Sequence, residues 1–220
     1  MKTKFIDRKD SSFVYWGTIR TVMTINDLFG RMEIYGWENI PKTPCIIVAN
    51  HVSFFDPPSM GFFCDYSMAS VLARGSLSDN RLMALYLKCL NAIALKRGGQ
   101  NDIGAIKESL KRIKNNSNVV IFPEGTRSDD GSLQRGKAGA SMIALKANVP
   151  ILPIRTFGFE KVLPKSNKLS GGARISFVVG KTVMPADVDP GKSCEDRMQV
   201  MADNIMNLIA QLKEPTLNEV

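Results

Sequence analysis

The chain has 220 residues, of which 44% are hydrophobic, so it is long and apolar enough for one domain with a sizeable core, and a disordered protein is excluded. Its formal net charge of +8 favours an anionic partner, which can be a phosphorylated small molecule, an acidic protein, a phospholipid surface or nucleic acid. A basic surface that serves solubility alone is the alternative. No uncharged apolar run reaches the roughly 18 residues of a membrane-spanning helix, so such a helix is not expected.

The first predicted element is an amphipathic helix over Phe13–Phe29. Its broad apolar arc consists of Val14, Tyr15, Ile19, Val22, Met23, Ile25 and Phe29. The opposite side contains Arg20 and Asp27, and these charges oppose a position across a bilayer. A helix that lies in the headgroup plane of a membrane fits this pattern. An ordinary helix packed on the domain core fits it as well.

Six short apolar runs without polar alternation predict buried strands further along the chain. They are Cys45–Ala49, Met68–Ala73, Ala92–Leu95, Val119–Phe122, Ile151–Ile154 and Ile175–Val179. Helical periodicity is found in Asp102–Lys114, Arg135–Ala147 and Cys194–Leu212. This alternation predicts an α/β fold with a mixed, largely parallel central sheet flanked by helices.

The segments around the last helix are also interpreted. Ser193 and Asp196 are expected to form a capping box at its start. Leu163–Ala173 and Pro185–Ser193 contain proline and glycine and are expected to be loops.

The four cysteines, at positions 45, 64, 89 and 194, form no C-x-x-C pair, and three of them lie in apolar runs. Buried free thiols in a reducing compartment are therefore expected. The chain has a single histidine with no cysteine at ligand spacing, so no zinc or other metal site is expected. The first ten residues are mostly polar and predict no secretory signal.

The run NHVSFFDP contains that histidine, His51, directly after the predicted strand Cys45–Ala49. In open α/β sheets, ligands collect beyond the carboxyl ends of strands. A neutral imidazole can take the proton of a hydroxyl that attacks a carbonyl, and a buried Asp56 can fix its tautomer and stabilise the imidazolium. The alternatives are a structural histidine and a helix N-cap at Asp56. Because the chain has no G-x-S-x-G nucleophile motif, direct acyl transfer to an external hydroxyl is the expected chemistry.

A second run, FPEGTRS, follows the predicted strand Val119–Phe122 and supplies groups for an anionic ligand. Gly125 allows close backbone approach, Thr126 offers a hydroxyl, and Arg127 has a fork suited to phosphate. Glu124 is an acceptor that can hold this arginine or a substrate hydroxyl. Arg97, in the run LKRGG at another strand end, adds a further cation. A plain polar turn is the alternative for EGTRS alone.

Together, these residues resemble the glycerolipid acyltransferase family, of which bacterial 1-acylglycerol-3-phosphate acyltransferase is a familiar member. NHVSFFD matches the His-x4-Asp motif of the family, and FPEGTRS matches its third motif almost letter for letter. LKRGG resembles the second motif, with Lys96 where many members have an acidic residue, and VPILPI resembles the fourth. The resemblance covers about residues 33–180.

The resemblance implies transfer of an acyl group from acyl-CoA or acyl carrier protein to the free hydroxyl of 1-acylglycerol-3-phosphate, without a cofactor. His51 would be the general base and Asp56 its orienting partner. Arg97, Glu124 and Arg127, with the Gly125–Thr126 turn, would bind the phosphate end of the acceptor. The resemblance also implies that residues 1–32 are an amphipathic membrane anchor and residues 33–220 the acyltransferase domain.

The expected location is the cytoplasmic face of the cell membrane, peripheral or monotopic, on an anionic surface. Other lysophospholipids, a non-phosphate acceptor, and water as in a thioesterase are rival acceptors. A catalytically silent membrane-binding module would be expected to lack His51 or Asp56, and both are present. Nucleic-acid binding is not expected, because the aromatic residues do not alternate with the basic ones.

Overall fold

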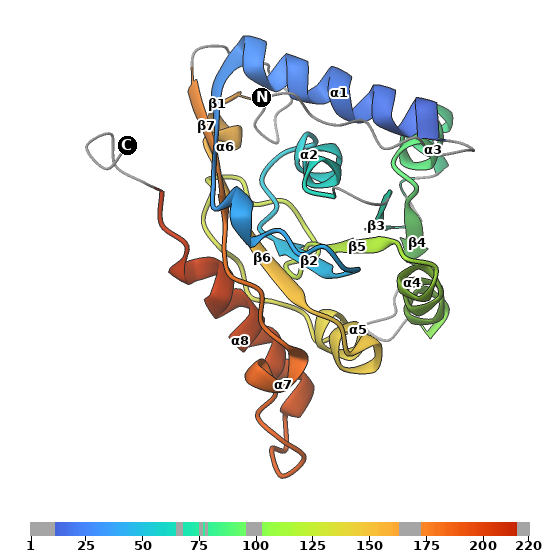
Figure 1. Ribbon diagram of the computed structural model, residues 1–220, viewed down its shortest axis with the longest axis vertical. Coiled ribbons are helices and arrows are strands. Elements are labelled where there is room, and N and C mark those ends of the chain that lie inside the picture. The colour runs from blue at the N-terminus through green and yellow to red at the C-terminus, as the bar shows by residue number, and fades with distance from the viewer. Residues whose placement is uncertain are drawn as a thin grey trace.

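A computed structural model describes residues 12–64, 68–74, 77, 79–95, 103–162 and 173–214. One seven-stranded sheet has the strand order β1-β7-β6-β2-β5-β3-β4 (Figure 1). Within it, β6 and β7 pair antiparallel and the other neighbours pair parallel. The predicted α/β fold with a mixed, largely parallel sheet flanked by helices is confirmed.

The strands are β1 (Gly30–Tyr35), β2 (Ile46–Ala49), β3 (Ala69–Arg74), β4 (Ile93–Leu95), β5 (Asn118–Ile121), β6 (Ile151–Phe157) and β7 (Ala173–Val179). The helices are α1 (Ser12–Phe29), η1 (Trp37–Asn39), α2 (Asp56–Phe62), α3 (Arg81–Cys89), α4 (Ile103–Lys114), α5 (Gly139–Ala147), α6 (Phe159–Val162), α7 (Pro185–Val188) and α8 (Arg197–Gln211). All six predicted strands and the four predicted helices are present.

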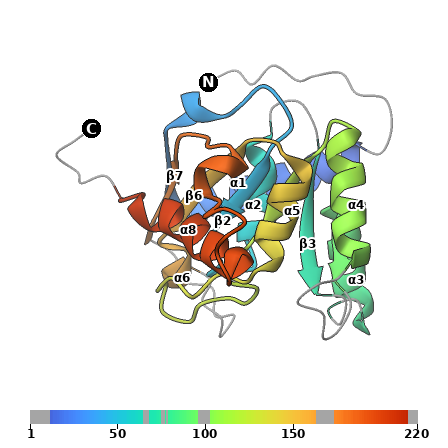
Figure 2. The ribbon, with the colours of Figure 1, turned by 90° about the horizontal axis from the view of Figure 1, so that it is seen from below.

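Helices cover both faces of the sheet (Figures 1 and 2). Successive side chains of β2 point to opposite faces, as a strand requires. Ile46 and Val48 pack in a buried cluster with α4, α5 and α8. Ile47 and Ala49 pack in a second cluster with α2 and α6. The uninterrupted apolar run of β2 is thus explained by burial on both faces.

The apolar arc of α1 is mostly buried, which corrects the expectation that it inserts below lipid headgroups. Tyr15, Ile19 and Met23 form a buried cluster with Leu90, and Val22 is buried as well. The helix lies over α2 (Figure 1), and a buried hydrogen bond of 3.0 Å joins Asn26 Nδ2 to Ser59 Oγ. The core-packing alternative therefore describes this arc. The predicted boundary between residues 32 and 33 falls inside β1.

Three local predictions differ from the structure, and some elements were not predicted. Strand β1 was not predicted, because Arg31 and Glu33 interrupt its apolar residues, and neither was α3. Helix α2 was considered only through the N-cap alternative for Asp56. Helix α5 begins at Gly139, later than predicted. The predicted loop 185–193 contains α7. The predicted capping box is wrong: α8 begins at Arg197, and its N-cap residue Asp196 makes no side-chain capping bond. Of the predicted loop 163–173, residues 163–172 lie outside the described residues.

No helix in the described ranges is long and apolar enough to span a membrane.

Candidate active site

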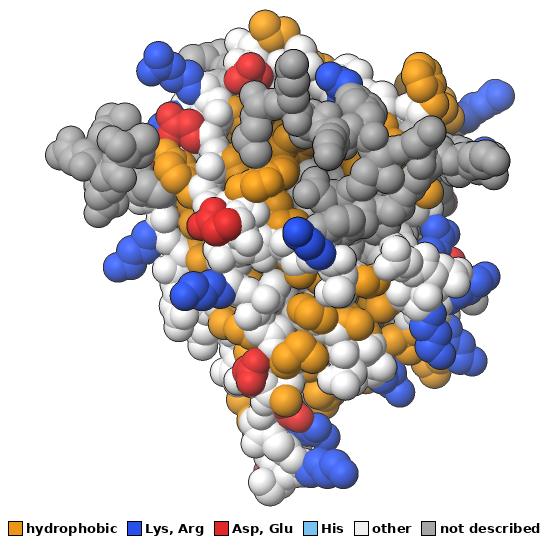
Figure 3. Space-filling view, in the orientation of Figure 1, with side chains coloured by type: hydrophobic (Ala, Val, Ile, Leu, Met, Phe, Trp, Pro, Cys, Tyr) orange, Lys and Arg blue, Asp and Glu red, His pale blue; other side chains and the backbone are white. Residues whose placement is uncertain are grey.

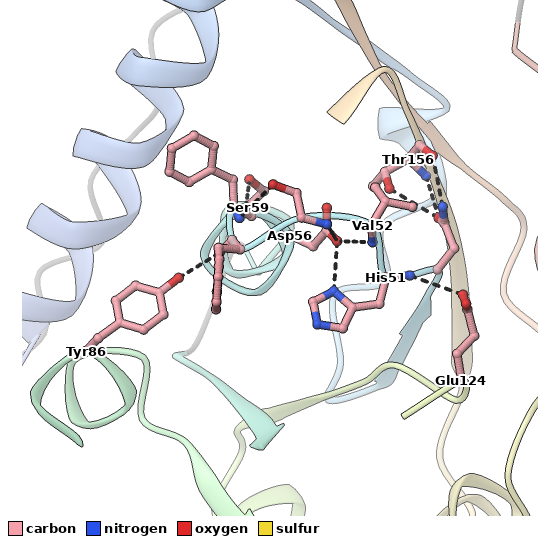
Figure 4. Close-up of polar contacts among 11 residues, drawn as sticks. His51, Val52, Asp56, Ser59, Tyr86, Glu124 and Thr156 are labelled. Carbon is pink, nitrogen blue, oxygen red and sulfur yellow. Dashed lines mark hydrogen bonds and ion pairs between the residues drawn. The ribbon is translucent and has the colours of Figure 1, made fainter. Parts of the chain in front are cut away.

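His51 and Asp56 are joined directly, as the sequence predicted. His51 follows β2 through Asn50, and Asp56 is the first residue of α2. His51 Nδ1 lies 2.9 Å from Asp56 Oδ2, and the carboxylate is fully buried (Figure 4). Since an ionised carboxylate can only accept a hydrogen bond, the neutral ring carries its hydrogen on Nδ1 and leaves Nε2 as the base.

Asp56 holds the loop of His51 rather than the start of α2. The same oxygen, Oδ2, accepts hydrogen bonds from the backbone N–H groups of Val52 at 2.6 Å and Ser53 at 2.7 Å. Both donors precede the helix, whose N-cap residue is Phe55 and has no side-chain capping bond. The N-cap interpretation of Asp56 is therefore wrong. The carboxylate instead fixes the loop and the imidazole together.

Two further contacts set the position of the His51 ring and backbone. The ring stacks on Phe122, with centroids 4.4 Å apart and planes inclined by 25°. The preceding residue, Asn50, exchanges two hydrogen bonds with the backbone of Thr156 on β6, at 3.0 and 2.8 Å. These contacts tie the end of β2 to both neighbouring strands, so the imidazole is presented by a rigid part of the sheet.

Glu124 is buried beside the same loop, on the opposite side of the His51 backbone from Asp56 (Figure 4). Its two carboxylate oxygens accept the backbone N–H groups of His51 at 3.1 Å and Gln134 at 3.3 Å. Burial raises the pKa of Glu124 to about 7, and these hydrogen bonds lower it only in part. The carboxylate thus accepts hydrogen bonds from the backbone. From the sequence, it was expected to bind Arg127 or a substrate hydroxyl.

A pocket of about 350 Å³ opens beside His51, and we call it the His51 pocket. Leu90, Ile106 and Ile143 form buried parts of its lining. Its cations are Arg74, Arg127 and Lys137, of which Arg74 and Lys137 are exposed. No carboxylate is among the described residues that line it. The pocket is therefore apolar at depth and positively charged where it opens.

The turn that follows β5 brings the predicted Gly125, Thr126 and Arg127 into the lining of this pocket. Gly125 has φ of +67°, a backbone conformation that favours glycine. The guanidinium of Arg127 lies 3.7 Å from the ring centroid of Phe54, and its buried Nη1 has no hydrogen-bond partner among the described residues. Burial lowers the pKa of Arg127. An anionic ligand would supply the missing acceptor.

Three polar residues of the pocket lining were not identified from the sequence. Arg74 donates from Nη2 to the carbonyl of Gly125 at 2.7 Å, and Tyr86 donates to the carbonyl of Phe54 at 2.8 Å. The third is Lys137. Arg74 ends a buried strand, which is a usable signal, but nothing in the sequence pattern marks the other two. The predicted Arg97 lies outside the described residues, and no metal-binding cluster occurs in the described part of the chain.

Comparisons with known proteins identify the family to which this chain is similar. A family model described as Acyltransferase matches residues 31–156. A 1-acyl-sn-glycerol-3-phosphate acyltransferase of Pseudomonas aeruginosa is 32% identical, over 80% of this chain and 66% of its own length. A chloroplastic one of Brassica napus is 28% identical, over 83% of this chain and 53% of its own. The chain spans about half the length of the curated plant relatives it matches.

A solved structure shows the same fold. The crystal structure of the 1-acyl-sn-glycerophosphate (LPA) acyltransferase PlsC from Thermotoga maritima has a TM-score of 0.68 to this chain, with 26% sequence identity. The match covers 89% of this chain and 78% of that one.

Proposed function

Because the chain belongs to the acyltransferase family, we propose that it transfers an acyl group from a thioester, acyl-CoA or acyl carrier protein, to the free hydroxyl of 1-acylglycerol-3-phosphate. The product is phosphatidic acid. The observation that supports this proposal is the His51 Nδ1–Asp56 Oδ2 contact of 2.9 Å at the edge of a pocket with an apolar depth and a cationic opening.

The proposed chemistry needs one base and no nucleophile of the protein. Nε2 of His51 takes the proton of the acceptor hydroxyl while that oxygen attacks the thioester carbonyl. Asp56 stabilises the imidazolium that forms. When the tetrahedral intermediate collapses, the C–S bond breaks and the imidazolium returns its proton to the leaving thiolate, so the enzyme regains its starting state.

The pocket suits the two ends of such substrates. The buried lining, which includes Leu90, Ile106 and Ile143, can hold an acyl chain, since apolar surface is removed from water there. Arg127, whose buried Nη1 has no partner within the described ranges, suits the phosphate of the acceptor. We assign Asp56 to orientation of His51 and Glu124 to support of its backbone.

We place the reaction on the cytoplasmic face of a membrane, where a lysophospholipid acceptor resides. The exposed apolar side chains of α1 include Phe13, at 90% exposure, and Val14, at 59%. The neighbouring helix α3 exposes Leu82 and Leu85. Figure 3 shows hydrophobic side chains beside Lys or Arg at the edge where α1 meets α3. These exposed residues, rather than the buried part of the α1 arc, support contact with a bilayer.

The membrane contact is tested by Phe13→Glu combined with Val14→Glu. We expect this double variant to bind anionic vesicles more weakly in a sedimentation assay, because two charges replace two inserted side chains. Thr24→Glu is the matched control, since Thr24 is exposed on the same helix. A double variant that sediments like the wild type would exclude this surface.

The acyl transfer itself is tested with labelled acyl donor and three acceptors in parallel: lysophosphatidate, monoacylglycerol and lysophosphatidylcholine. We expect transfer to lysophosphatidate to be fastest and to require His51. Running acyl-CoA and acyl carrier protein side by side identifies the donor. Thioester turnover that does not depend on any acceptor would refute the proposal and indicate a thioesterase.

A further inference from the structure

Lys137 and Arg74 are the two cations in the described lining of the His51 pocket that neither a predicted motif nor the proposed chemistry uses. Lys137 lies between β5 and α5, and its side chain lines the pocket together with Gly125 and Arg127. A Cβ added at Gly125 would lie 2.8 Å from Lys137 Nζ, so the ammonium group sits directly over that turn. The described residues offer Lys137 no carboxylate partner at ion-pair distance.

The backbone around Lys137 is held from two directions. Its own N–H donates to the carbonyl of Pro123 at 2.9 Å, which ties it to the turn after β5. The carbonyl of the preceding Gly136 accepts from Gln199 Nε2 of α8 at 2.8 Å. Gly136 is also packed so tightly on α8 that an added Cβ would lie 3.0 Å from the carbonyl oxygen of Ala202. The start of the Lys137 side chain is therefore fixed before any ligand arrives.

The turn beneath Lys137 is fixed as well. Arg74 donates to the carbonyl of Gly125 from the side of β3. Arg74 thus has a protein acceptor, whereas the ammonium of Lys137 and the Nη1 atom of Arg127 have none among the described residues. A pocket with these two donors and no carboxylate in its described lining attracts an anion, and both donors flank the same turn.

From this arrangement we propose that Lys137 binds the phosphate of the acceptor together with Arg127, and so makes the enzyme selective for phosphorylated acceptors. The inference rests on the proposed function. A phosphomonoester carries close to two negative charges at neutral pH, and two cations on one turn match that charge. The buried lining of the pocket, with Leu90, Ile106 and Ile143, is apolar, so a lipid with a charged head and an acyl tail fits both parts.

The test compares Lys137→Gln with Lys137→Arg and with Lys146→Gln, an exposed lysine of α5 that does not line the pocket. We expect Lys137→Gln to raise KM for lysophosphatidate roughly 5–10-fold, a modest factor because the site is open to solvent. KM for monoacylglycerol and for the acyl donor should change less than twofold. Lys137→Arg should restore most of the loss, because it restores the charge.

Two outcomes would overturn the inference. One is a KM for lysophosphatidate in Lys137→Gln that is no higher than in Lys146→Gln. The other is an equal rise of KM for the acyl donor, which would assign Lys137 to the donor phosphates.

A second experiment measures binding by calorimetry. Lysophosphatidate is titrated into the His51→Ala variant and into the His51→Ala, Lys137→Gln double variant. This readout needs no turnover. If the wild type transfers no acyl group, the proposed function fails, while the affinity difference still decides whether Lys137 binds the phosphate.

Discussion

The loop from His51 to Asp56 and the turn from Phe122 to Ser128 meet at one pocket but satisfy their polar groups differently. In the first, Asp56 Oδ2 accepts three hydrogen bonds from within the loop, and Asp56, whose Oδ1 has no partner among the described residues, does not line the pocket. In the second, Arg127 lines the pocket and has a buried nitrogen that finds no hydrogen-bond partner in the described part of the chain. The two are joined by a 2.7 Å bond from the Ser128 N–H to the His51 carbonyl. The first is built to hold geometry, and the second is built to receive a ligand, so changes in the first should lower kcat and changes in the second should raise KM.

The largest effect is expected for His51→Ala. Removal of the only base should lower kcat by ~10²–10⁴-fold, the usual contribution of a positioned general base. Thermal unfolding should change little, since the ring is partly exposed. Steady-state kinetics and a melting curve check both statements. A variant that keeps more than half of the wild-type kcat would remove His51 from the mechanism.

Asp56→Asn should have the second-largest effect on kcat. It separates the contribution of the Asp56 charge from its contribution to the geometry of the loop. Two backbone N–H groups donate to Oδ2, so the asparagine must keep its carbonyl oxygen there, and His51 keeps its tautomer. The lost negative charge should lower kcat on the order of 10²–10³-fold. Asp130→Asn is the control, because this exposed carboxylate serves only its own turn. Near-normal kcat in a less stable Asp56→Asn protein would give Asp56 a purely structural role.

Arg127→Ala tests the other region. We expect KM for lysophosphatidate to rise roughly 10-fold, with kcat changed much less, because a charge-assisted contact to phosphate is lost. Monoacylglycerol should be affected far less. Arg135→Ala serves as control, since Arg135 pairs with Asp203 and does not line the pocket. Equal losses on both acceptors would show that Arg127 holds the turn or the acyl donor.

Glu124 links the two regions, and Glu124→Gln should have the smallest effect on activity. Burial raises the pKa of Glu124 in the fold to about 7 from an ordinary 4.5, so folding favours the protonated carboxyl. The stabilisation is complete below about pH 4.5 and is lost as the pH rises through 7. The melting temperature of the wild type should therefore fall more between pH 5 and pH 8 than that of Glu124→Gln. Parallel melting curves across this range would show that Glu124 does not titrate there.

The sequence was informative where the physical cause is local. Continuous apolar runs such as Ile46–Ala49 predicted strands, because only burial on both faces permits them. His51 and Asp56 were paired correctly because one short loop joins them. The positions of Gly125 and Arg127 were predicted correctly because both residues follow β5. This strand pairs parallel with β2, so the carboxyl ends of the two strands lie at the same edge of the sheet.

Contacts between distant segments had to come from the tertiary structure. The helical periodicity of the sequence indicates which side of α1 is apolar, but it does not indicate which residues pack against that side. In the structure these are α2 and Leu90. Glu124 belongs to the FPEGTRS motif, from which a contact with Arg127 or a substrate hydroxyl was expected. Its partners in the structure are the backbone N–H groups of His51 and Gln134. The backbone at Lys137 is held by hydrogen bonds to the distant Gln199 on α8 and to the carbonyl of Pro123. Such pairings depend on how helices cross the sheet, and that is decided by the packing of the whole core.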